Sequence, residues 1–134
     1  RGARAGGGGR ARRVRGATMS VATRARGETW LWLAQRASAA VLAVCVVVHL
    51  GTMIYAVRGG LTAAEILGRV RGSAAWEIFY WVFVLAVAVH APLGLRTIAR
   101  ELTGWRGPTL EAATALAAFL LAFFGGRAVT GLVG

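Results

Sequence analysis

The sequence contains no lysine and no aspartate: its 16 basic residues are all arginine and its 5 acidic residues are all glutamate. It has a single cysteine, Cys45, which excludes a disulfide within the chain and a thiolate cluster around zinc or iron–sulfur. Charged residues make up only 16% of the 134 residues, whereas 57% are hydrophobic. This balance is too apolar for an ordinary soluble domain and indicates a membrane protein.

The apolar residues gather in three long runs, over residues 30–57, 74–98 and 108–133. A helix needs about 20 predominantly apolar residues to cross a bilayer, and each run is long enough. We therefore predict an all-α fold, an integral membrane three-helix transmembrane bundle that forms one domain over residues 30–134. A short interfacial helix is expected over residues 62–69, and a tight turn over residues 100–107.

Residues 1–29 form a basic, glycine-rich head that has no hydrophobic periodicity, so we predict that this head is disordered. Met19 begins a stretch that resembles a natural start, which suggests that residues 1–18 are not native. The net charge of +11 raises nucleic-acid binding as a hypothesis. Arginines that flank apolar runs are more typical of membrane proteins, so we expect contact with membrane lipid and no nucleic acid.

The distribution of arginine also predicts an orientation. If the three helices alternate in direction, the head and the turn at residues 100–107 share one side of the membrane, and that side carries most of the arginines. Cytoplasmic segments of membrane proteins carry such an excess. We therefore predict a multi-pass protein of a bacterial inner (plasma) membrane with a cytoplasmic N-terminus.

Three ionisable residues lie within the apolar runs: Arg36, His49 and His90. Such groups are costly at bilayer depth, so each one suggests a function. The alternatives are structural. The Arg36 side chain could reach the membrane interface, and each histidine could simply hydrogen-bond to a neighbouring helix.

The surroundings of His90 suggest a haem ligand. Ala86 and Gly94 lie one turn either side of His90 on the same helical face, and such small residues leave room for a flat, bulky group. Haem iron accepts imidazole as an axial ligand. Arg96 follows towards the cytoplasmic end, where its side chain could hold a haem propionate.

His49 and His90 lie at different depths. At about 1.5 Å per residue, His49 lies roughly 25 Å beyond Trp32 and His90 roughly 12 Å before Ile98, both measured from the cytoplasmic side. Two imidazoles on one metal need their nitrogens only about 4 Å apart. We therefore expect that a metal bound by either histidine takes its other ligand from a second subunit or a second copy of this chain.

At this point two segments resemble the membrane-anchor, cytochrome b subunits of succinate dehydrogenase and fumarate reductase. The first helix opens with QRASAAVLA, which is similar to the family's Arg-x-Ser/Thr start. The second ends with HAPLGLRTIARE, which is similar to its His-x-x-x-Gly-x-Arg segment followed by an acidic residue. The resemblance covers residues 30–101 by motif and the third helix by topology.

The resemblance implies that His90 is the axial ligand of haem b and that Arg96 lies beside the haem propionates. It places Arg36 and Ser38 near the quinone pocket, and Glu101 stands where the family usually has Asp. His49 resembles the first-helix histidine of two-haem members. The complex would then hold one haem b or two, shared with a partner subunit, with quinone as the substrate.

The chain would not be catalytic alone. A flavoprotein subunit would oxidise succinate or reduce fumarate, and an iron–sulfur subunit would pass electrons to quinone. This chain, with a second membrane-anchor chain or a second copy of itself, would hold them to the membrane. Three alternatives remain open, and the first two are another membrane b-type cytochrome and a cofactor-free membrane anchor or assembly protein. A third is that the arginine-rich head binds anionic lipid or nucleic acid.

Overall fold

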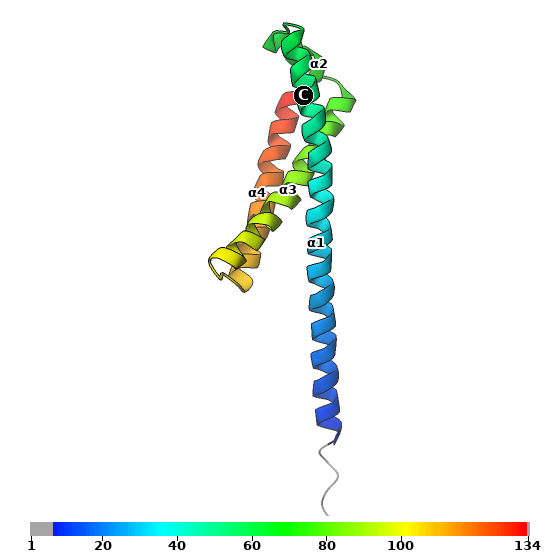
Figure 1. Ribbon diagram of the computed structural model, residues 1–134, viewed down its shortest axis with the longest axis vertical. Helices are drawn as coiled ribbons and strands as arrows, with labels where there is room; N and C mark the ends of the chain where they lie inside the picture. The colour runs from blue at the N-terminus through cyan, green and yellow to red at the C-terminus, as the bar shows by residue number, and fades with distance from the viewer. Residues whose placement is uncertain (1–6, 134) are drawn as a thin grey trace, which may run out of the picture. The chain divides into compact units, whose positions relative to one another are not determined.

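The structure is a computed structural model that describes residues 7–133. Its regular elements are all helices, shown in Figure 1: α1 (Gly7–Arg58), α2 (Ala63–Val70), α3 (Ala74–Leu102) and α4 (Pro108–Val133). The predicted all-α fold is therefore confirmed. The chain divides into two units, Arg1–Leu33 and Ala34–Gly134, and the candidate functional residues all lie in the second.

Three segments are long and apolar enough to cross a membrane: Ala25–Arg58, Ala74–Leu102 and Pro108–Val133. Large apolar side chains point outward on each of them, such as Val47, Ile78 and Phe124. Exposed apolar side chains in such number are unfavourable in water, whereas the lipid tails of a bilayer cover them. The helices also satisfy their own backbone hydrogen bonds, as a membrane requires. The chain is a multi-pass membrane protein, and the three predicted apolar runs are confirmed as helices.

The prediction for the head was wrong where the structure describes it. Residues 7–29 belong to α1, whereas the sequence predicted a disordered segment over residues 1–29. The reason is that alanine and arginine are both strong helix formers, and the apolar span behind them provides a helix that can extend by propagation without new nucleation. Residues 1–6 lie outside the described part of the chain.

The short helix α2 begins at a capping box. The Thr62 backbone N–H donates to Glu65 Oε2 at 2.7 Å, and the Glu65 backbone N–H donates to Thr62 Oγ1 at 3.3 Å. The bonds from the Thr62 backbone and hydroxyl hold the pKa of the Glu65 carboxyl below its ordinary value. The predicted short helix is confirmed, with Thr62 as its N-cap.

The helices α3 and α4 lie side by side (Figure 1), and two glycines allow their close approach. A Cβ on Gly125 would lie 2.6 Å from Val84 Cγ1, and a Cβ on Gly126 would lie 3.0 Å from Trp81 Cη2. Small residues at such contacts let membrane helices approach closely. This packing fixes the position of α3, which carries His90 and Arg96.

Candidate functional site

His90 on α3 is hydrogen-bonded to α1. Its Nδ1 lies 3.5 Å from Oγ of Ser38, which is buried, and the Ser38 hydroxyl donates to the Gln35 backbone carbonyl at 3.0 Å. Because a hydroxyl has one hydrogen to donate, Ser38 accepts from His90. Nδ1 of His90 then carries the proton and Nε2 keeps its lone pair. His90 is half-buried, so part of its side chain is accessible.

Gly94 lies one turn beyond His90 and meets the same stretch of α1. A Cβ on Gly94 would lie 3.2 Å from Gln35 Nε2, so the glycine makes room for this side chain. Gln35 Oε1 is buried without a hydrogen-bond partner among the residues that the structure describes. An unpaired buried acceptor is energetically costly. The space at Gly94, which the sequence suggested for a flat group, is therefore occupied by Gln35.

Arg96 forms an ion pair with Glu111 in the first turn of α4. Its Nε donates to the two carboxylate oxygens at 3.1 and 3.0 Å, and its Nη2 donates to Oε1 at 2.7 Å. Such charge-assisted, forked contacts are the strong ones. The Arg96 side chain is 9% exposed and the Glu111 side chain 54% exposed, so the cation is inside and the carboxylate reaches outward. The guanidinium is thus placed to hold a carboxylate, the group that a haem propionate also presents.

The three residues expected at a quinone pocket lie in different environments. Arg36 and Glu101 are exposed, whereas Ser38 is buried against His90. Since Ser38 meets His90 and Gln35 meets Gly94, α1 and α3 are antiparallel here. Arg36 and Glu101 therefore both lie towards the same membrane side, the side away from α2.

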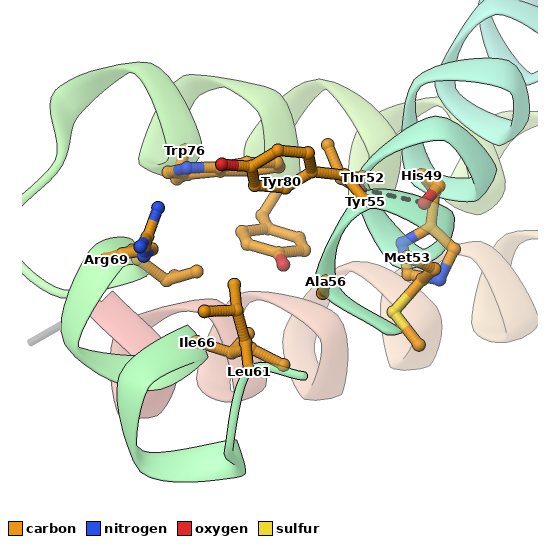
Figure 2. A pocket seen from close by; sticks show the side chains of 11 residues that line it. His49, Thr52, Met53, Tyr55, Ala56, Leu61, Ile66, Arg69, Trp76 and Tyr80 are labelled. Carbon is orange, nitrogen blue, oxygen red and sulfur yellow. Dashed lines mark hydrogen bonds between the residues drawn. The ribbon is translucent and has the colours of Figure 1, made fainter. Parts of the chain in front are cut away.

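His49 lines two neighbouring cavities, one among α1, α2 and α3 and the other between α1 and α3. The first has a volume of about 340 Å³, and Figure 2 shows His49 at one end of it and Arg69 and Trp76 at the other. The second has a volume of about 380 Å³ and is lined by His49, Tyr80 and the side chains of Cys45, Val46, Phe79 and Phe83. Both volumes lie within the range of ligand pockets, roughly 300–1,000 Å³. His49 is therefore next to space that a ligand of moderate size could occupy.

The two histidines lie at different depths, as their positions in the sequence predicted. His90 lies at the level of Ser38, whereas His49 lies about 16 Å further along α1 at 1.5 Å per residue. This separation is too large for two imidazoles to bind one metal ion. Each histidine can therefore contribute a single ligand to a separate site.

Two residues of this region were missed by the sequence analysis. Glu111, an acidic residue in the first turn of α4, was given no functional role from the sequence. The short turn between α3 and α4 was the signal that could have paired it with Arg96, because antiparallel helices bring such residues together. Gln35 was interpreted only as part of the motif at the start of the first helix, and nothing in the sequence shows that its Oε1 is buried.

A family model described as the succinate dehydrogenase/fumarate reductase transmembrane subunit matches residues 17–128 of the chain. No curated protein and no solved structure matches the chain significantly. The matched range includes His49, His90, Arg96 and Glu111, and it reaches into all three membrane-spanning segments.

Proposed function

Because the chain belongs to the succinate dehydrogenase/fumarate reductase transmembrane subunit family, we propose that it is the membrane-anchor, cytochrome b subunit of a succinate:quinone oxidoreductase or quinol:fumarate reductase. In this function it binds haem b and forms part of the quinone site, where electrons pass between an iron–sulfur subunit and quinone. The family match over residues 17–128 carries the proposal. The hydrogen bonding of His90 supports it.

Two described residues carry groups that suit haem b, although Gln35 fills the space at Gly94 that was expected for a flat group. His90 would hold the iron through Nε2, because Nδ1 is engaged by Ser38. Arg96 would hold a propionate, since its guanidinium already binds a carboxylate with good geometry. When bound, haem b supplies one-electron transfer, and this chain tunes it through ligation and burial.

Arg36 and Glu101 are the proposed quinone-binding residues. Both are exposed on the membrane side away from α2. A guanidinium can donate a hydrogen bond to a quinone oxygen, and a carboxylate can exchange the proton that quinone reduction requires. The resemblance also implies a quinone role for Ser38, which lies deeper and against His90.

The proposed partners carry the chemistry that this chain does not. A flavoprotein subunit handles succinate or fumarate, and an iron–sulfur subunit relays electrons to quinone at the cytoplasmic side of a bacterial inner membrane. A second membrane-anchor chain, or a second copy of this one, would supply a further ligand. The excess of arginine on the side of the N-terminus supports a cytoplasmic N-terminus.

His49 is the proposed ligand of a second haem, so the complex would hold two haems if this site is used. The two cavities beside His49 support this role, because one is mainly apolar and the other has Arg69 at the end away from the imidazole. A ligand with an apolar body and an anionic edge would suit an apolar cavity together with the Arg69 guanidinium.

The test is to purify the complex through a tag on this chain in a mild detergent. We expect it to contain a flavoprotein and an iron–sulfur subunit, haem b at one or two per chain, and succinate-dependent quinone reduction. Haem without succinate-linked activity would indicate another membrane b-type cytochrome. A chain that carries neither haem nor partner subunits would instead be a cofactor-free anchor.

A further inference from the structure

We propose that Ser38 is a positioning residue for the haem ligand: its hydroxyl fixes the tautomer of His90 so that Nε2 is the nitrogen offered to iron. This inference rests on the proposed function, since it concerns the haem that His90 would hold. It replaces the quinone role that the family resemblance implies for Ser38.

The direction of the hydrogen bonds carries the argument. The series begins at His90 Nδ1, passes through Ser38 Oγ at 3.5 Å and ends at the Gln35 carbonyl oxygen at 3.0 Å. A backbone carbonyl can only accept, so Ser38 must donate to it. The serine hydrogen is then used, and the oxygen can offer His90 only a lone pair. His90 must therefore donate, which places its proton on Nδ1.

The consequence concerns metal binding. A neutral imidazole has one bare nitrogen, and with Nδ1 protonated this nitrogen is Nε2. Without the hydroxyl, the proton can occupy either nitrogen, and the Nε2–H tautomer cannot bind iron through Nε2. A hydrogen bond from Nδ1–H also makes the ligating nitrogen more basic. The contact of 3.5 Å is long, so its role is to select a tautomer more than to stabilise the fold.

The single hydrogen of the Ser38 hydroxyl also argues against a quinone role for this residue. A quinone carbonyl needs a donor, and the only hydrogen on this hydroxyl goes to the Gln35 carbonyl. Ser38 is also only 7% exposed, whereas Arg36 is exposed. Arg36 can therefore meet a quinone oxygen where Ser38 cannot.

The first experiment compares the purified complex with three variants: Ser38→Ala, Ser38→Thr and Thr114→Ala. Thr114 is a matched control, because its half-buried hydroxyl donates to the Leu110 carbonyl of its own helix. Removing such an outer partner weakens metal binding on the order of 10–100-fold. We expect Ser38→Ala to lose haem faster by about this factor and to have a more positive haem midpoint potential, because a less basic ligand stabilises ferric iron less. Ser38→Thr, which keeps the hydroxyl, and Thr114→Ala should match the wild type.

The second experiment does not depend on haem. Full-length chain with ¹⁵N-labelled histidine is studied by NMR in micelles, and His49→Ala identifies the His90 signals. We expect the Nδ1–H tautomer in the otherwise unchanged chain and a population of the Nε2–H tautomer once Ser38→Ala is added. An Nε2–H tautomer with Ser38 present would overturn the inference.

The inference would also fail if Ser38→Ala kept the haem loss rate and midpoint potential of the wild type and only raised the KM for quinone. A wild-type complex without haem would overturn the proposed function instead. The NMR experiment would still decide whether Ser38 sets the tautomer of His90.

Discussion

The ion pair between Arg96 and Glu111 predicts a measurable coupling between α3 and α4. Breaking a buried pair by removing one partner costs about 3–5 kcal/mol, because an uncompensated charge stays buried. The Arg96 side chain is 9% exposed, but Glu111 is 54% exposed, so water reaches one side of the pair. We discount the cost for this solvation and expect Glu111→Gln to destabilise the chain by about 1–2 kcal/mol.

A double-mutant cycle isolates the pair from the effect of Glu111 on the dipole of α4. The cycle combines Arg96→Gln and Glu111→Gln in the full-length chain without haem, so that no propionate competes for Arg96. Unfolding by SDS in mixed micelles can be followed by tryptophan fluorescence, since Trp81 lies at the contact between α3 and α4. We expect a coupling energy of about 1–2 kcal/mol.

The matched control is Glu101→Gln, which removes an exposed carboxylate from the last turn of α3. Its effect should stay within about 0.5 kcal/mol. The reasoning is refuted if the cycle gives a coupling below about 0.5 kcal/mol, the scatter expected for independent sites, or if Glu111→Gln is no more harmful than the control.

Two further predictions concern packing and pH. Gly125→Ala should destabilise the chain by about 1–3 kcal/mol, because its Cβ would overlap the stiff Val84 side chain. The control Gly131→Ala should be neutral or stabilising, because nothing lies within 4 Å of the added Cβ. Equal effects of the two substitutions in the same unfolding assay would contradict this account. The lowered pKa of Glu65 means that the ionised carboxyl stabilises α2 above its ordinary pKa of 4.5, and that this stabilisation is lost as the pH falls through the lowered value. Hydrogen exchange of the α2 amides should therefore speed up below about pH 4.5, relative to the intrinsic rate. Glu65→Gln should abolish this pH dependence. The same pH profile of protection in the wild type and in Glu65→Gln would refute the role of the capping box.

The spanning helices and α2 could be predicted because their signals are local. The length of each apolar run decides whether a helix can cross a bilayer, and Thr62 and Glu65 stand at the spacing of a capping box. The head was predicted wrongly because the prediction used its composition alone and ignored the helix that follows it. A segment rich in alanine and arginine propagates from an existing helix more readily than it forms one alone.

The details of the site depend on how the helices are rotated against one another, which a single sequence does not determine. The sequence located His90 and Arg96, but it could not show that Glu111 binds Arg96 or that Ser38 faces His90. These contacts depend on close packing, such as the space at Gly94 that Gln35 enters. Motif reasoning thus suggests a candidate ligand, while the residues that contact it require the structure.

The central claim is that this chain is a haem-binding anchor whose ligand is His90. The most direct measurement is the reduced-minus-oxidised visible spectrum of the purified complex, with haem counted per chain, for the wild type, His90→Ala and His49→Ala. The account predicts a b-type spectrum in the wild type, loss of the haem held by His90 in His90→Ala, and at most a partial loss in His49→Ala. A His90→Ala complex with the haem content and spectrum of the wild type would contradict it.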